Sequence, residues 1–270
     1  MVGFCGKPPF RSPHCVHQLR PLPAFEDNYI WTLANDHDQA VVVDPGDAAP
    51  VLAAIEAGLR PVALLLTHHH ADHVGGAAGI LDRFDIPCFA PHDERIVRAS
   101  RRVRDGDRVE IPELGLAFDV LEIPGHTRSH IAFHGGGVLF CGDTLFSMGC
   151  GRMFEGTPAQ MLRSLDRLAA LPGDTQVCCG HEYTVANGRF AQAAEPANAA
   201  RDRRQEEARA QRAAGLPTLP STLAGERECN PFLRVDVPGL RANLEARAGG
   251  PLDREAAFAA LRAWKDEFRG

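Results

Sequence analysis

The chain has 270 residues, and its 29 lysines and arginines against 35 aspartates and glutamates leave a net charge of −6. This acidic balance argues against a broad nucleic-acid surface, which needs a basic face. Hydrophobic residues at 44% and charged residues at 24% are ordinary values and exclude a disordered or fibrous chain. No apolar run approaches the ~20 residues that cross a bilayer, so we expect no nucleic acid and no membrane as partners.

The N-terminal sequence and the cysteines indicate the cellular compartment of the protein. The first twenty residues contain Lys7, Arg11 and Arg20 but neither a continuous apolar stretch nor a small-residue cleavage site, so they do not predict a signal peptide. We assign residues 1–20 to an N-terminal extension. The eight cysteines show no zinc-finger spacing, and several lie in apolar runs, where a free thiol behaves as a small hydrophobic side chain. We therefore expect a reducing compartment and a cytoplasmic protein.

Short apolar runs recur along the first two thirds of the chain, and each run ends beside a His or an Asp. Such runs, closed by turn-forming residues, are typical of buried strands. Side chains just beyond the carboxyl ends of strands are where α/β proteins build their sites. The predicted strands are Ala40–Val43, Val62–Leu66, Phe118–Ile123, Val138–Cys141 and Gln176–Cys179.

Helical patterns lie between these runs. Asp47 and Thr157 are predicted N-caps for two of the helices, and the second helix has a proline at its first position. Alternating strands and helices predict a layered α/β domain, to which we assign residues 21–183. The predicted helices are Ala48–Leu59, Val74–Phe84 and Pro158–Leu171.

After about Tyr183 the pattern becomes helical, and we assign residues 184–270 to a smaller C-terminal helical domain. Asp253 is a predicted N-cap for the last helix. That helix carries large apolar residues at helical spacing, and we expect this stripe to pack against the rest of the protein. The stripe consists of Phe258, Leu261, Trp264 and Phe268.

One short segment carries four candidate metal ligands in the pattern H-x-H-x-D-H: His68, His70, Asp72 and His73. In an extended chain residues i and i+2 point the same way, so His68 and His70 can approach one ion. If the chain then turns into a helix, Asp72 and His73 can face a second ion. His69 falls on the opposite side, and we expect a structural, hydrogen-bonded histidine there.

Three further candidate ligands, His126, Asp143 and His181, each follow a predicted strand. Imidazole and carboxylate together suit zinc, iron or manganese. The donors suffice for two ions if Asp143 bridges them, and two ions roughly 3.5–4 Å apart can hold a hydroxide and polarise a carbonyl. An adventitious His-rich tract is the alternative, but such a tract needs no matching residues at distant strand ends. We therefore expect a hydrolase in which Asp72 and Asp143 position the bridging hydroxide.

These motifs resemble a known superfamily. The H-x-H-x-D-H signature, followed by Gly125-His126, Gly142-Asp143 and Gly180-His181, is similar to the metallo-β-lactamase superfamily. That resemblance implies a four-layer αβ/βα sandwich with the metal site at one edge of two packed sheets. More specific blocks resemble glyoxalase II, the hydroxyacylglutathione hydrolases, in family order from about residue 21 onward. These blocks include residues 25–31, 149–156, 179–184, 220–223 and 230–234.

The resemblance also implies roles for individual residues. Asp143 bridges two metals, and Asp44 is a candidate for orienting a ligand histidine from behind. The first metal is bound by His68, His70 and His126, and the second by Asp72, His73 and His181. The family's glutathione-binding positions are occupied by Arg152, Phe154, Tyr183 and Arg234. The two carboxylates of glutathione suit the forked guanidinium donors of arginine. The resemblance also implies that the C-terminal helical domain, residues 184–270, binds substrate.

Two departures from the family pattern bear on substrate affinity. Phe154 stands where many members have a tyrosine, and Val237 stands where some relatives have a lysine. Losing one charge-assisted contact costs very roughly 1.5–3 kcal/mol of binding if nothing replaces it. Both changes therefore bear on acyl-group preference and affinity more than on the hydrolytic chemistry.

The implied function is hydrolysis of S-D-lactoylglutathione to D-lactate and glutathione, the second step of methylglyoxal detoxification. We expect two divalent cations per chain, with zinc as the preferred metal and iron or manganese as alternatives. We also expect the protein to be a monomer. Another superfamily hydrolase (a thioesterase, lactonase or β-lactamase) and a mononuclear-iron persulfide dioxygenase are the alternatives, against which Asp72, His181 and the Asn230–Arg234 block argue. A non-catalytic metal-binding or RNA-processing protein is a further alternative, and the acidic charge disfavours the RNA role.

Overall fold

The structure is a computed structural model that describes residues 17–270. Most of the expected N-terminal extension therefore lies outside the described residues. Its last residues do not, because the first strand, β1, begins at Gln18. Among the described residues, no helix combines the length and apolar character needed to span a membrane.

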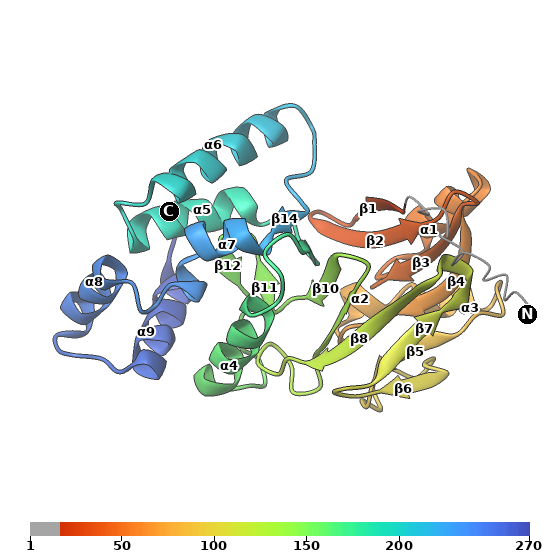
Figure 1. The fold of residues 1–270 in the computed structure, drawn as a ribbon, viewed down its shortest axis with the longest axis horizontal. Coiled ribbons are helices and arrows are strands. Elements are labelled where there is room, and N and C mark those ends of the chain that lie inside the picture. The colour runs from red at the N-terminus through yellow and green to blue at the C-terminus, as the bar shows by residue number, and fades with distance from the viewer. Residues whose placement is uncertain (1–16) are drawn as a thin grey trace, which may run out of the picture.

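Two mixed sheets of six strands each pack face to face (Figure 1). The first has the order β1-β2-β3-β4-β5-β6, with β1 to β3 antiparallel and β3 to β6 parallel. Its strands are β1 (Gln18–Ala24), β2 (Asn28–Ala34), β3 (Gln39–Val43), β4 (Arg60–Leu65), β5 (Cys88–Pro91) and β6 (Arg101–Val103).

The second sheet has the order β14-β13-β10-β9-β8-β7, and its one parallel pair is β10 with β13. A separate hairpin pairs β11 (Leu145–Phe146) with β12 (Gly149–Cys150). The strands of the second sheet are β7 (Arg108–Ile111), β8 (Leu116–Glu122), β9 (Ile131–Gly135), β10 (Val138–Gly142), β13 (Gln176–Cys179) and β14 (Ser221–Thr222).

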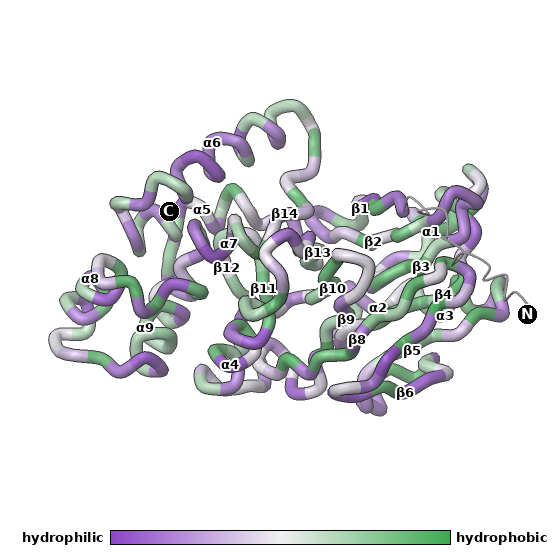
Figure 2. The backbone as a smooth tube through the Cα atoms, in the orientation of Figure 1, coloured by the Kyte–Doolittle hydropathy of each residue, from purple (hydrophilic) through white to green (hydrophobic). Residues whose placement is uncertain are grey.

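The period of two along the strands divides the apolar residues between two cores. In β3, Val41 and Val43 belong to the larger core shared with the second sheet, whereas Val42 belongs to a smaller core under helices. In Figure 2 β3 is correspondingly green, as expected for a strand that is buried on both faces.

Helices cover both sheets and complete the predicted four-layer αβ/βα sandwich. The helices α1 (Ala48–Glu56) and α3 (Ala77–Leu81) bury apolar side chains against the first sheet, and α4 (Pro158–Ala169) buries Met161 and Leu165 in the larger core. Both predicted caps are confirmed. Asp47 accepts a hydrogen bond from the Ala49 amide, and Thr157 forms a reciprocal capping box with Gln160.

The predicted helix over Val74–Phe84 is wrong in its extent. The structure has a short α2 (Ala71–Val74) and a separate α3, interrupted at Gly75–Gly76. The chain passes so close to the turn before α1 that a Cβ on Gly76 would lie 2.4 Å from the Ala48 nitrogen. This close approach requires glycine, and the Gly75-Gly76 pair is the local sequence signal for a break that the prediction overlooked.

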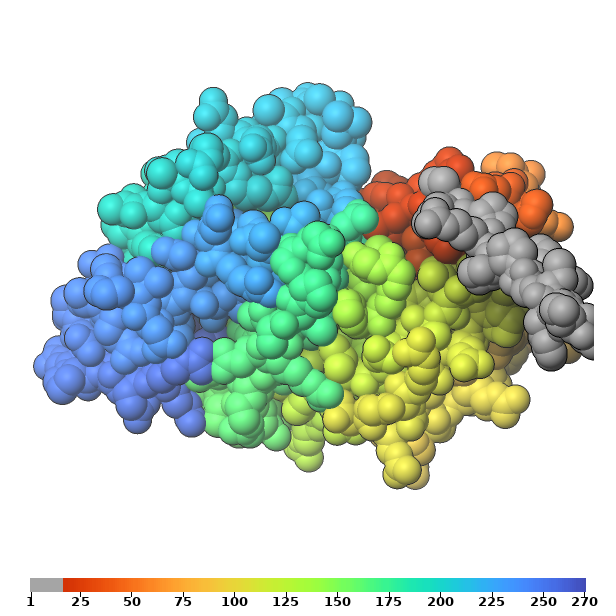
Figure 3. All heavy atoms as spheres, viewed as in Figure 1, coloured from red at the N-terminus to blue at the C-terminus, as the bar shows by residue number. Residues whose placement is uncertain are grey.

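The C-terminal region is mainly helical, as predicted, and in Figure 3 it lies directly against the green segment that contains α4. The predicted apolar stripe of the last helix is confirmed, since Phe258 and Leu261 are fully buried in the larger core. By contrast α6 is largely hydrophilic (Figure 2). The region also adds β14 to the second sheet. Its helices are α5 (Thr184–Ala194), α6 (Ala199–Ala213), α7 (Leu223–Cys229), α8 (Pro238–Ala248) and α9 (Arg254–Glu267).

Candidate metal centre

Segments that follow β4, β8, β10 and β13 meet at one edge of the sandwich and bring the predicted ligands together. Two groups of three form there, each with donor atoms within 4.8 Å of one another. The first group is His68, His70 and His126, and the second is Asp72, His73 and His181.

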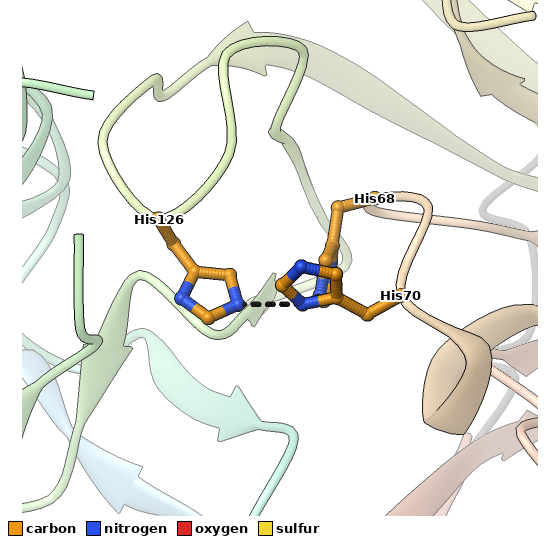
Figure 4. A group of neighbouring side chains, drawn as sticks. All are labelled: His68, His70 and His126. Atoms are coloured by element: carbon orange, nitrogen blue, oxygen red, sulfur yellow. Dashed lines mark hydrogen bonds between the residues drawn. The ribbon is translucent and has the colours of Figure 1, made fainter. Parts of the chain in front are cut away.

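In the first group three imidazole nitrogens converge (Figure 4). His70 Nδ1 lies 3.2 Å from His68 Nε2 and 3.0 Å from His126 Nε2. His68 and His70 come from the segment after β4, whereas His126 comes from the loop after β8 on the other side. The two sheets therefore each contribute donors to this group.

Asp143 lies between the two groups. Its Oδ1 is 3.3 Å from His73 Nε2, and its Oδ2 is 3.3 Å from His181 Nε2 and 3.5 Å from His126 Nε2. Gly142, immediately before it, has φ +46°, and a Cβ there would lie 2.4 Å from Thr67 Oγ1. The strand end thus needs glycine to bring Asp143 this close to the histidines.

Outer hydrogen bonds determine which histidine nitrogens face inward. His126 Nδ1 donates to the Arg152 carbonyl (2.7 Å), and His181 Nδ1 donates to Asp27 Oδ1 (2.8 Å). His73 Nδ1 lies 3.1 Å from Asp44 Oδ2. These partners keep a proton on Nδ1, so Nε2 is the nitrogen that each histidine turns toward the centre.

Asp44 also accepts hydrogen bonds from Thr67. It has φ +50° and accepts from the Thr67 amide (2.7 Å) and from Thr67 Oγ1 (2.7 Å). Although Asp44, His68 and His73 form a third group of nearby donors, both oxygens of Asp44 are already bonded to Thr67. Asp44 therefore stands behind His73 and outside the inward-facing donors.

The donor set fits cations. His73 Nε2 and Asp143 Oδ1 are buried without a hydrogen-bond partner among the described residues. Lone pairs and carboxylate charge that crowd together without donors are unfavourable unless a cation accepts them. Five imidazoles and two carboxylates in two adjoining groups are consistent with a binuclear metal site, a donor chemistry that zinc, iron and manganese accept.

The electrostatics of the two groups differ. Burial lowers the pKa of all three histidines of the first group, His68, His70 and His126, so this group is neutral. Burial alone would lower the pKa of His181, but Asp143 and Asp72 raise it to about 10. Cation binding at the second group therefore displaces protons.

Comparisons with known proteins agree with this geometry. Residues 27–181 match the family described as the metallo-beta-lactamase superfamily, and residues 182–268 match the hydroxyacylglutathione hydrolase C-terminus. A hydroxyacylglutathione hydrolase of Xanthomonas campestris pv. campestris (strain B100) is 56% identical over 255 residues, which is 93% of this chain and 99% of the relative. The chain belongs to the hydroxyacylglutathione hydrolase family. The predicted family and fold are thereby confirmed.

Further relatives extend the comparison. A hydroxyacylglutathione hydrolase of Xylella fastidiosa (strain M12) is 53% identical over 93% of this chain and 97% of the relative. Among solved structures, TTHA1623 in a di-iron-bound form is 27% identical, with a TM-score of 0.55 over 82% of this chain and all of that one. ETHE1 from Myxococcus xanthus shares the fold at 24% identity, with a TM-score of 0.62 over 93% and 90% of the two chains.

Beside the metal donors of this hydroxyacylglutathione hydrolase lies an open cavity of about 420 Å³. Two of the predicted substrate residues, Phe154 and Tyr183, line it. The Tyr183 ring is stacked on His181, with centroids 4.7 Å apart and planes 4° from parallel. Phe154 is 61% exposed, and its ring forms a T-shaped pair with that of His126, with centroids 5.3 Å apart. Both residues are therefore placed to contact a ligand at the metal donors.

A second cavity of about 280 Å³ shares Tyr183 with the first, and its charged lining residues are Arg152, Arg262, Lys265 and Asp266. Residues Arg262 and Lys265 of α9 were missed by the sequence analysis. Both lie in the helix that carries the predicted apolar stripe. Two cationic residues three positions apart beside that stripe were the sequence pattern from which a role could have been predicted. Arg262 is buried and donates to the Cys150 carbonyl at 2.8 Å.

Arg234, the fourth predicted substrate residue, lies elsewhere. It donates to both oxygens of Glu195, at 2.9 and 2.7 Å, and is not among the residues that line either cavity. Its predicted contact with glutathione therefore rests on the family resemblance alone. The sequence analysis also gave no role to Asp27, which holds His181, or to His130, whose ring stacks on His68 at 4.5 Å.

Proposed function

We propose that the chain cleaves S-D-lactoylglutathione, or a close 2-hydroxyacyl analogue, to the free acid and glutathione. The reaction class follows from the family: the chain is a hydroxyacylglutathione hydrolase and performs the glyoxalase II step of methylglyoxal detoxification. The observation that carries the proposal is the position of Asp143 between two groups of inward-facing donors, near a cavity with three cationic side chains and one carboxylate in its lining.

In this proposal, the two groups of donors hold two divalent cations, with Asp143 between them. Zinc is the preferred candidate for both cations. When bound, the cations lower the pKa of a water molecule and polarise the thioester carbonyl. Asp44 and Asp27 keep the protons of His73 and His181 on Nδ1, so that the Nε2 atoms stay available. Because a thiolate is a good leaving group, no side chain is needed as a strong general acid.

The glutathione part occupies the second cavity in this proposal. Glutathione has two carboxylates, and Arg152, Arg262 and Lys265 supply cationic donors for them. Asp266 already accepts from Arg262 Nη2 at 3.1 Å and lies 3.7 Å from Arg152 Nε, which keeps the two guanidinium groups side by side. Tyr183 lines both this cavity and the cavity at the metal donors, so the thioester group of the bound substrate would lie beside it.

We further propose that the protein acts as a monomer in the cytoplasm. The metal donors and the cationic cavity are all built from one chain, so the site needs no second copy. Cys141, Cys178 and Cys179 are buried free thiols, which suit a reducing compartment.

The proposed function is tested by thiol release from S-D-lactoylglutathione. We expect rapid release by metal-loaded protein, loss after chelation, and recovery when zinc is added back. The control substrate is S-D-lactoyl-N-acetylcysteamine, which has the same thioester without the glutathione carboxylates. Its kcat/KM should be much lower than that of S-D-lactoylglutathione. Metal-loaded protein that releases no thiol from the first substrate would contradict the assignment.

A pH effect on KM follows from Lys265. Burial and the nearby Arg262 lower the pKa of Lys265 to about 8. The ammonium is charged below that pH and neutral above it, so KM for S-D-lactoylglutathione should rise as the pH passes through about 8. Lys265→Arg keeps its charge and should have a flat KM over this range. Lys265→Met should also have a flat KM, about tenfold or more above that of the parent below pH 8, and the two values should converge above pH 8. Identical KM profiles for all three proteins would refute a carboxylate contact at Lys265.

A further inference from the structure

A compact group of charged side chains lies beside the metal donors without belonging to them. Arg95 donates to both oxygens of Asp93, from Nε at 2.8 Å and from Nη2 at 2.7 Å, and from Nη1 to Glu155 Oε1 at 2.6 Å. One guanidinium therefore bonds two carboxylates. We call Asp93, Arg95 and Glu155 the Arg95 network.

The Arg95 network connects loops that are far apart in the sequence. Ser129 Oγ donates to Asp93 at 2.6 Å, and the backbone amide of Arg128 donates to Glu155 at 2.9 Å. His69, the histidine that points away from the metal donors, lies 3.4 Å from Asp93 and 3.6 Å from Glu155. The network thus joins the loop after β5 to the segments that carry His69, Arg128 and Glu155.

Glu155 is the member that reaches the substrate side. It follows Phe154 directly, and both Phe154 and Arg152 belong to the segment 151–156 that borders the cavities. The same segment is bonded to His126 twice, through the Phe154 amide (3.2 Å) and the Arg152 carbonyl (2.7 Å). His126 holds this segment on one side, and the Arg95 network holds it on the other.

Arg95 is the only cation in the described part of the chain that contacts Asp93 and Glu155 together. The Asp93 side chain is only 5% exposed, and Arg95 holds the pKa of Glu155 down at about 2, so both carboxylates are charged. Without the guanidinium, two partly buried negative charges would face each other and push the 151–156 segment away. Lysine cannot replace it fully, because a single ammonium lacks the planar fork that bonds both carboxylates.

We propose that Arg95 is a positioning residue for substrate binding, which acts through Glu155 to hold Phe154 at the metal donors and Arg152 at the second cavity. This inference rests on the proposed function. It assigns the Arg95 network an effect on KM rather than on metal binding, because none of its three members is a predicted metal ligand.

The test is a kinetic comparison of Arg95→Met, Arg95→Lys and Glu155→Gln with the parent chain, all loaded with zinc. KM for S-D-lactoylglutathione should rise about tenfold in Arg95→Met and in Glu155→Gln, the low end of what outer partners of a site contribute, with kcat and two metals per chain retained. Arg95→Lys should recover part of the loss. The double variant Arg95→Met/Glu155→Gln should be no worse than either single variant, since both remove the same interaction.

Arg98→Met is the matched control, because Arg98 lies on the same loop but pairs with the exposed Asp82. It should behave as the parent. An unchanged KM in both Arg95→Met and Glu155→Gln would overturn the inference, as would loss of metal in proportion to activity, which would place the network in the metal centre. If the zinc-loaded parent itself releases no thiol, the proposed function fails, and that outcome is distinct from either of these.

Discussion

Replacing Asp143 by Asn should abolish thioester hydrolysis while leaving the fold intact. Burial would raise the pKa of Asp143, but His73 and His181 hold it well below its usual range, so the carboxylate is charged at every working pH. Asn keeps the shape and removes the charge between the two groups of donors. We expect kcat to fall by at least about a thousandfold, because even outer partners of metal ligands contribute about 10–100-fold.

Metal analysis and circular dichroism complete this test. Asp143→Asn should hold fewer than two metals per chain with an unchanged far-ultraviolet spectrum. Asp119→Asn, which alters an exposed carboxylate paired with Arg108 on the second sheet, is the matched control and should retain full activity. An Asp143→Asn protein with two metals and parental turnover would remove Asp143 from the centre.

Replacing Asp44 by Asn should release the cation of the second group. Asp44 accepts from Thr67 through both oxygens and holds the Nδ1 proton of His73. An Asn carboxamide that keeps the bond from the Thr67 amide presents its NH₂ to His73, which favours a proton on Nε2 instead. A protonated Nε2 cannot bind a cation, so we expect metal content to fall toward one per chain and kcat to fall about 10–100-fold.

The control for Asp44→Asn lies three residues further on. Asp47→Asn makes the same change at the N-cap of α1, where Asn is an equally good cap, and should leave metal content and turnover unchanged. The two variants together separate an effect on His73 from a general effect on this turn. Equal metal content in Asp44→Asn and the parent would show that Asp44 does not orient a ligand.

The metal donors could be predicted because their signal is local. Each candidate follows an apolar run, and strand ends of one sandwich meet at the same edge, so His126, Asp143 and His181 come together without knowledge of the turns between them. The same reasoning placed His69 on the far side of its segment, and the structure has it facing Asp93 and Glu155. Alternation along a strand was enough for that distinction.

The partners behind the donors could not be predicted in this way. Asp27 lies 154 positions from His181, and the Arg152 carbonyl that holds His126 is a backbone group without a sequence signature. The role expected for Arg234 had the same weakness, since Glu195 reaches it through tertiary packing alone. Contacts between segments that are distant in the sequence determine these features, and such contacts cannot be predicted from residue spacing.

The order of the donors along the chain also bears on how the protein matures during synthesis. The first group is complete once His126 has been made and the second once His181 has been made, whereas Arg262 and Lys265 lie near the C-terminus. All the donors proposed for the cations are therefore synthesised before the cationic residues proposed to recognise glutathione. A chain that had grown only to His181 would contain every metal donor and still lack Arg262 and Lys265 for holding a substrate.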